Sequence, residues 1–92
     1  MKTLFITGGS TGIGAASVRK FIDQGWNVGF MDINGQAGES LLEKIGKPEQ
    51  LLFVKGDTRC REDIRKAVEK TAERFGAINS TVANAGIHRR NT

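Results

Sequence analysis

The sequence has no tyrosine and only one cysteine and one histidine among its 92 residues. Because Cys60 has no second cysteine to pair with, it cannot form a disulfide within the chain, which is typical of a protein from a reducing compartment. Cys60 and His88 cannot supply the ligand set of a metal site, so we expect none. No apolar run reaches the roughly 18 residues that a membrane span needs, and the apolar stretch at the N-terminus is too short for a secretory signal. These absences predict a cytoplasmic protein with no membrane partner.

Lysine and arginine outnumber aspartate and glutamate by 14 to 10, which gives a formal net charge of +4. A basic balance suits an anionic ligand, and nucleic acid is one candidate. The basic residues are scattered over predicted helix faces, however, and their one local cluster is His88-Arg89-Arg90. We therefore expect no nucleic-acid partner.

Short apolar runs alternate with segments of helical period along the whole chain. The apolar runs occupy residues 4–6, 28–31, 51–54 and 78–83. Runs of this length are typical of buried strands in a parallel sheet. The helical segments between them end at Gly25, Gly46 and Gly76. The pattern predicts a single α/β domain over 1–92, in which β-α-β-α-β-α-β forms a doubly wound parallel sheet with helices on both faces. The fourth strand is expected to leave an open edge.

A glycine-rich segment, from Thr7 to Gly14, joins the first apolar run to the first helical segment. A turn of this kind lets a phosphate approach the backbone, and the helix that follows directs its unpaired N–H groups at the anion. A P-loop would need Lys and Ser or Thr where Ala15 and Ala16 stand, and the G-x-G-x-x-G fingerprint would need a glycine where Ser17 stands. The spacing that fits completely is T-G-x-x-x-G-x-G. The candidate phosphate-binding residues are Gly8, Ser10, Thr11, Gly12, Ile13 and Gly14.

Asp32 directly follows the second apolar run and ends the predicted strand, 18 residues after Gly14, and Ile33 comes next. A carboxylate at this position can accept hydrogen bonds from the hydroxyls of an adenosine ribose. It also disfavours a 2′-phosphate, because two like charges about 4 Å apart cost roughly 4 kcal/mol at an effective dielectric constant of 20. This predicts NAD rather than NADP. The alternative is that Asp32 only caps a loop.

Polar residues also follow the third and fourth apolar runs. Asp57 can bind the amino group of an adenine, or it can cap the next helix, as can Thr58. Asn84-Ala85-Gly86 follows the fourth run, where loops at the carboxyl edge of a parallel sheet line the ligand crevice. These residues complete a predicted dinucleotide site.

Together these residues resemble the short-chain dehydrogenase/reductase family. The segment from Thr7 to Gly14 matches the family's T-G-x-x-x-G-[IL]-G motif, and Asp32 matches its acidic NAD selector. Asp57 matches its adenine-contacting aspartate. Asn84-Ala85-Gly86 matches its N-N-A-G motif, with Ala83 in place of the first asparagine. The resemblance implies a Rossmann-type fold and hydride transfer between a nicotinamide and an alcohol or carbonyl substrate, in a homo-oligomer. Thr11 stands where NADP-preferring members often carry a basic residue, which again favours NAD.

The resemblance also implies that the catalytic residues lie outside this sequence. The family's acid/base is a tyrosine assisted by a lysine four residues later, and this chain has no tyrosine. We therefore predict no catalytic residue here and interpret the 92 residues as the N-terminal, NAD-binding half of a short-chain oxidoreductase, truncated before its catalytic half. Two alternatives remain: a stand-alone NAD-binding or regulatory module without turnover, and a structural piece that dimerises through the open sheet edge.

Overall fold

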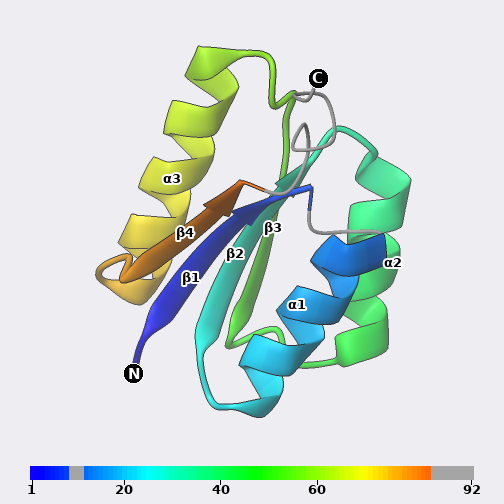
Figure 1. Cartoon of the computed structure of the whole chain (residues 1–92), viewed down its shortest axis with the longest axis vertical. Helices are drawn as coiled ribbons and strands as arrows, with labels where there is room; N and C mark the ends of the chain where they lie inside the picture. Colours follow the sequence, from blue (N-terminus) through cyan, green and yellow to red (C-terminus); the bar gives the residue numbers. More distant parts are fainter. Residues whose placement is uncertain (9–11, 84–92) are drawn as a thin grey trace.

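Four parallel strands lie side by side in the order β3-β2-β1-β4 in a computed structural model of the chain (Figure 1). The structure describes residues 1–8 and 12–83. The strands are β1 (Thr3–Thr7), β2 (Asn27–Asp32), β3 (Leu51–Lys55) and β4 (Ser80–Ala83), and the helices are α1 (Gly12–Asp23), α2 (Gly35–Ile45) and α3 (Arg61–Phe75). The predicted order of elements and the parallel sheet are both confirmed.

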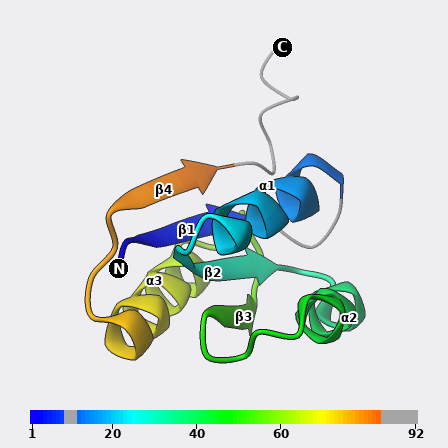
Figure 2. The same cartoon turned by 90° about the horizontal axis from the view of Figure 1, so that it is seen from below.

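The helices cover both faces of the sheet, as Figure 2 shows with α1 and α2 on one side and α3 on the other. Side chains of a strand point alternately to the two faces, so neighbouring residues of β1 enter different cores. Leu4 and Ile6 pack with Val18 of α1 and Leu41 of α2, whereas Phe5 packs with Ala67 of α3. This confirms the doubly wound, Rossmann-type arrangement.

Two glycines let helices approach the sheet closely. A Cβ on Gly29 in β2 would lie 2.6 Å from Cγ2 of Thr71 in α3, and a Cβ on Gly38 in α2 would overlap the ring of Phe53 in β3. The buried hydroxyl of Thr71 donates to the carbonyl oxygen of Ala67 at 2.8 Å, which fixes the side chain against Gly29. Larger residues at these positions would push the helices outward.

The predicted helix stops are confirmed. Gly46 adopts a left-handed conformation with φ of 68° after α2, and its N–H donates to the carbonyl oxygen of Leu42. Gly25 and Gly76 follow α1 and α3 with φ of 89° and 99°. The local punctuation of the sequence therefore sets where each helix ends.

The fourth strand differs from its prediction in length and in burial. It begins at Ser80 instead of residue 78. Asn79, just before the strand, is hydrogen-bonded to Thr3 through its backbone and its side chain. The Asn79 N–H donates to the Thr3 carbonyl, and the Thr3 N–H donates to Asn79 Oδ1, both at 2.9 Å. All four residues of β4 are exposed, so the expectation of a buried strand was wrong. No segment of the described chain lies beyond β4, which forms the predicted open edge.

Candidate functional site

The carboxyl ends of the strands bring those predicted site residues that the structure describes to one edge of the sheet. Backbone hydrogen bonds join the segments there. The Gly8 N–H donates to the Met31 carbonyl at 2.7 Å, and the Gly56 N–H donates to the Asp32 carbonyl at 3.0 Å. The turns that follow β1, β2 and β3 are therefore neighbours, as a shared ligand would require.

Two described glycines of the turn adopt the left-handed backbone conformation that glycine favours. Gly8 and Gly12 have positive φ values of 69° and 56°, and α1 begins at Gly12. A Cβ on Gly12 would meet no described atom within 4 Å. Gly14 is buried, while the Ile13 side chain is 77% exposed. The first turn of α1 holds no acidic residue, so no carboxylate there opposes an anion at the helix N-terminus. Ser10 and Thr11 lie outside the described residues.

Asp32 also shapes the loop that follows β2. Its Oδ1 accepts a hydrogen bond from the Asn34 N–H at 3.0 Å, and Asn34 in turn caps α2 by accepting from the Ala37 N–H at 3.0 Å. Asp32 therefore does cap the loop that follows β2. It leaves the side chain at the same edge as the glycine turn, with the exposed Ile33 beside it.

The sequence analysis missed Lys55, the last residue of β3. The register pairs it with Asp32, so both side chains point to the face that α1 and α2 cover. The Lys55 stem passes the start of α2, where a Cβ on Gly35 would lie 3.3 Å from its Cδ. The signal in the sequence was a basic residue directly after the third apolar run, and its pairing with Asp32 comes from the strand register. Lys55 places a cation next to the strand that ends in the predicted NAD selector.

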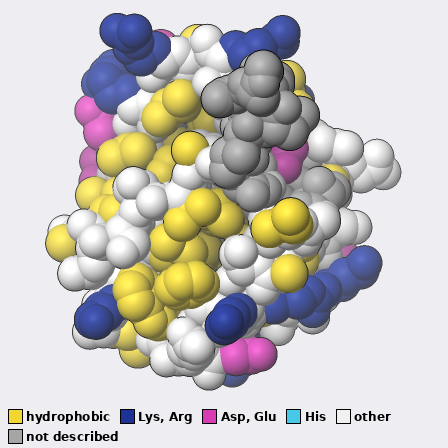
Figure 3. Space-filling view, in the orientation of Figure 1, with side chains coloured by type: hydrophobic (Ala, Val, Ile, Leu, Met, Phe, Trp, Pro, Cys, Tyr) yellow, Lys and Arg dark blue, Asp and Glu magenta, His cyan; other side chains and the backbone are white. Residues whose placement is uncertain are grey.

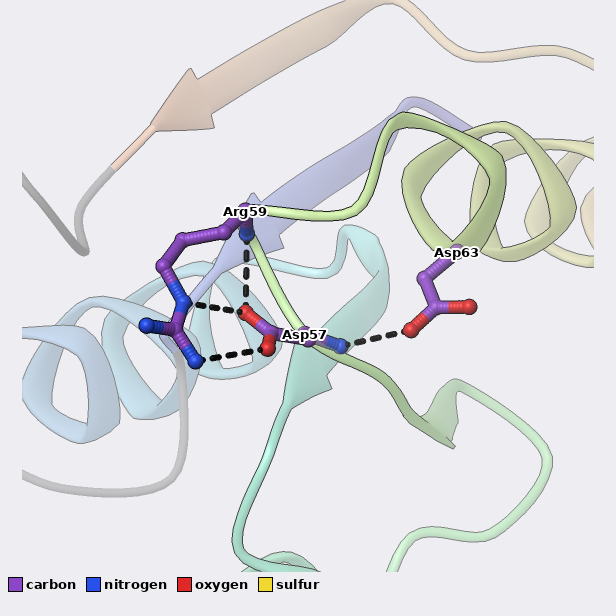
Figure 4. A network of polar contacts seen from close by, with 3 residues as sticks. All are labelled: Asp57, Arg59 and Asp63. Carbon is purple, nitrogen blue, oxygen red and sulfur yellow. Dashed lines mark hydrogen bonds and ion pairs between the residues drawn. The ribbon is translucent and has the colours of Figure 1, made fainter.

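Asp57 does not cap α3, so one of the two roles predicted for it from the sequence is wrong. The helix begins at Arg61 after Cys60, which is extended and makes no side-chain cap bond, so Thr58 does not cap it either. The carboxylate of Asp57 binds Arg59 (Figure 4): Oδ1 accepts from the backbone N–H at 2.8 Å and from Nε at 3.2 Å, and Oδ2 accepts from Nη2 at 3.0 Å. Hydrogen bonds from the Arg59 side chain and then from its backbone hold the pKa of the Asp57 carboxyl below its ordinary value.

An apolar cavity of about 300 Å³ opens between α3 and the β1–β4 half of the sheet. Figure 3 shows hydrophobic side chains gathered over the middle of the face on which β4 lies, with lysine and arginine side chains at its margins. The cavity is lined by Phe5, Thr7, Thr58, Ile64, Val68 and residues 81–83. The cavity reaches the site edge through Thr7 and Thr58, and neither Asp32 nor Asp57 lines it.

The remaining predicted residues, Asn84, Ala85 and Gly86, lie outside the described part of the chain. Over residues 1–8 and 12–83, no three His, Cys, Asp or Glu side chains are grouped closely enough to hold a metal ion. No helix in those ranges is long and apolar enough to cross a bilayer.

Comparisons with known proteins place this chain in one family. A family model described as short chain dehydrogenase matches residues 2–92. The chain is 39% identical over 87 residues to L-fucose dehydrogenase of Mus musculus, and 34% identical over 86 residues to zerumbone synthase of Zingiber zerumbet. These alignments cover 95% and 94% of this chain but 31% and 32% of the two relatives. The chain thus spans about a third of their length.

Solved structures agree with the sequence comparison. A short chain dehydrogenase from Bacillus anthracis superimposes with a TM-score of 0.85 at 34% identity, over 91% of this chain and 34% of that one. A short-chain dehydrogenase/reductase from Brucella melitensis, described as a glucose/ribitol dehydrogenase, superimposes with a TM-score of 0.84 at 31% identity, over 87% of this chain and 34% of that one.

Proposed function

Because the chain belongs to the short-chain dehydrogenase family, we propose that it is the NAD(H)-binding part of an oxidoreductase that transfers a hydride between the nicotinamide and an alcohol or carbonyl substrate. The nicotinamide ring supplies the hydride or accepts it. The residues described here bind and orient the dinucleotide. The proposal includes a cytoplasmic location and a homo-oligomeric whole protein.

The observation that carries the proposal is the pair of positive-φ glycines, Gly8 and Gly12, at the N-terminus of α1. Gly8 and Gly12 have backbone conformations that side chains rarely tolerate, and a Cβ on Gly12 would meet no described atom within 4 Å. A pyrophosphate fits such a turn because it can approach backbone N–H groups without meeting a Cβ. The proposed phosphate-binding residues are Gly8, Ser10, Thr11, Gly12, Ile13 and Gly14.

The strand ends extend the proposed site along the sheet edge. Asp32, with Ile33, would bind the adenosine ribose, and Asp57, with Thr58, would bind the adenine. Asn84, Ala85 and Gly86 would face the nicotinamide ribose. The hydrogen bond between Gly56 and the Asp32 carbonyl supports this arrangement, because it keeps the second and third of these segments together.

We propose NAD rather than NADP as the preferred cofactor. A 2′-phosphate on the ribose would face the Asp32 carboxylate, and like charges about 4 Å apart repel by roughly 4 kcal/mol at an effective dielectric constant of 20. Lys55 on the neighbouring strand end would offset part of this repulsion. The preference for NAD over NADP therefore requires that the repulsion of a 2′-phosphate by Asp32 exceed its attraction to Lys55.

No catalytic residue is assigned within these 92 residues. The chain contains no tyrosine, and a phenol with a pKa near 10 needs a cationic neighbour to act as a base at neutral pH. A second candidate function is a dinucleotide-binding module without turnover. Both functions require the chain to bind NAD.

Two glycine variants test cofactor binding. Gly12→Val places a branched side chain in the turn, whereas Gly25→Val makes the same change beyond the other end of α1, also at a positive φ with open space around it. Calorimetric titration should show that Gly12→Val loses NAD binding by about a hundredfold or more, while Gly25→Val retains it, with similar helix content by circular dichroism. Equal NAD affinity in both variants would contradict the proposed pyrophosphate site.

A further inference from the structure

The carboxylate of Asp57 has its hydrogen-bonding capacity largely used within its own loop. An ionised carboxylate offers about four acceptor positions, two on each oxygen. Oδ1 accepts two hydrogen bonds from Arg59, one from the backbone N–H and one from Nε. Oδ2 accepts one, from Nη2. Counting the described residues, one acceptor position is left, and it lies on Oδ2.

The backbone of this loop is fixed independently of Arg59. The Asp57 N–H donates to Oδ2 of Asp63, in the first turn of α3, at 2.9 Å (Figure 4). The Asp57 carbonyl accepts from the Cys60 N–H at 2.9 Å. A Cβ on Gly56 would lie 2.8 Å from the sulfur of Met31, so the chain before Asp57 is tightly packed. These contacts fix the backbone position of Asp57, and the hydrogen bonds from Arg59 fix the orientation of its carboxylate.

Arg59 has little to contribute to folding. Its side chain is 83% exposed, against 30% for Asp57, and ion pairs between exposed side chains contribute little to stability. A two-pronged guanidinium contact, however, defines the orientation of a carboxylate more sharply than a single contact does. The arginine is thus placed to orient Asp57 and contributes little to the core.

We propose that Arg59 is a positioning residue, which turns the Asp57 carboxylate so that Oδ2 presents its one remaining acceptor position to the exocyclic amino group of a purine. This inference rests on the proposed function, since it assumes that Asp57 faces the base of the cofactor. The ligand chemistry that fits is a 6-amino purine. A 6-keto purine would present a carbonyl oxygen to a carboxylate oxygen, and two acceptors cannot bond. A preoriented carboxylate also loses less rotational freedom when the ligand binds.

The test compares two dinucleotides and two arginine variants by calorimetric titration. The ligands are NAD and its hypoxanthine analogue, in which the adenine amino group is replaced by a keto oxygen. Arg59→Met removes the guanidinium but keeps most of the stem. Arg65→Met is the matched control, because Arg65 is also an exposed arginine with carboxylate partners, Glu62 and Glu69, but lies on the surface of α3.

We expect the unmodified chain to bind NAD about tenfold more tightly than the analogue, the value of one hydrogen bond to a charged acceptor. Arg59→Met should reduce this ratio to about two or less while changing the affinity for the analogue less than about twofold. Arg65→Met should leave both affinities unchanged. In an Asp57→Ala background, Arg59→Met should have no further effect on the ratio, because the arginine acts through the aspartate.

Three results would overturn the inference. If the unmodified chain binds NAD and Arg59→Met keeps the full NAD-to-analogue ratio, Arg59 does not orient Asp57 toward the base, and the proposed function stands. If Arg59→Met weakens both ligands equally, the arginine acts elsewhere, again with the proposed function intact. If the unmodified chain binds neither dinucleotide, the proposed function fails and this inference fails with it.

Discussion

The backbone N–H of Gly56 donates a hydrogen bond of 3.0 Å to the carbonyl oxygen of Asp32 and so joins the turns that follow β2 and β3. Through this contact, Asp32 and Asp57, which are 25 residues apart in the sequence, stand at the ends of neighbouring strands. A ligand that spans the sheet edge from the glycine turn would meet the two carboxylates in succession.

Cofactor selectivity should depend on the charge of Asp32. Asp32→Asn retains an oxygen that can accept from the Asn34 N–H, so the turn is kept while the negative charge is removed. The preference for NAD over NADP should fall by about tenfold or more, because the repulsion of a 2′-phosphate disappears. Competitive titration with the two cofactors measures this. Adding Lys55→Met should reverse part of the gain in NADP affinity, and an unchanged preference in Asp32→Asn would remove Asp32 from the selector role.

The Asp57 carboxyl should titrate at a lower pH than an ordinary aspartate. Arg59 stabilises the ionised form through side-chain and backbone hydrogen bonds, so the pKa in the folded chain lies below the ordinary value of 3.8. The unfolded chain therefore binds more protons between the two pKa values. The contribution of this group to stability is present above about pH 4 and is lost as the pH falls through the folded pKa.

Carbon-13 NMR of the carboxyl groups measures this titration directly. Arg59→Met should raise the pKa of Asp57 toward 3.8 and leave that of Glu62 unchanged. Arg65→Met should do the reverse, since Arg65 lowers the pKa of Glu62. A midpoint at or above 3.8 for Asp57 in the unmodified chain would show that the Arg59 contact does not persist in solution.

Replacing Gly38 by alanine should destabilise the chain although alanine favours helices. The new Cβ would overlap the ring of Phe53, and overpacking of this kind costs about 1–3 kcal/mol. Gly35→Ala in the same helix is the control. Its Cβ would lie 3.3 Å from Cδ of Lys55, a side chain that can move away. Urea denaturation should show a lower midpoint for Gly38→Ala and a midpoint near the original for Gly35→Ala. Equal midpoints would mean that α2 does not pack on β3 as described.

Two buried threonines should respond oppositely to replacement by valine. The Thr3 hydroxyl is buried and has no hydrogen-bond partner among the described residues, so Thr3→Val should raise the free energy of unfolding by about 1 kcal/mol. Thr71→Val removes the hydrogen bond to the Ala67 carbonyl and should lower it by about 1 kcal/mol. Thermal unfolding followed by circular dichroism compares the two, and a loss of stability in Thr3→Val would indicate that its hydroxyl has a partner.

Local patterns predicted the elements well because their causes are local. The apolar runs, the helical spacing and the glycines at 25, 46 and 76 each act over a few residues, and the structure has strands and helices in the predicted order. The positive φ values of Gly8 and Gly12 were equally accessible, since they follow from residue type. The open edge at the fourth strand followed from the topology.

Features that depend on side-chain placement across the chain were not predictable in this way. The position of Lys55 beside Asp32 depends on strand register, which the two separate runs do not define. Whether Asp57 caps α3 or binds its own loop depends on where the helix starts. Because α3 starts at Arg61, the Asp57 carboxylate binds Arg59, and the Asp57 N–H donates to Asp63. The exposure of β4 likewise depends on which segments lie beside it.

The most direct test of the central claim, that the carboxyl edge of this sheet binds NAD, is a nitrogen-15 NMR titration of the chain with NAD. We expect saturable shifts of the backbone amides of Gly8, Gly12, Gly14, Asp32 and Asp57. The amides of Gly25, Gly46 and Gly76, which lie beyond the carboxyl ends of the helices, should stay in place. Saturable shifts confined to those three glycines, or no saturable shift at any residue, would contradict the account.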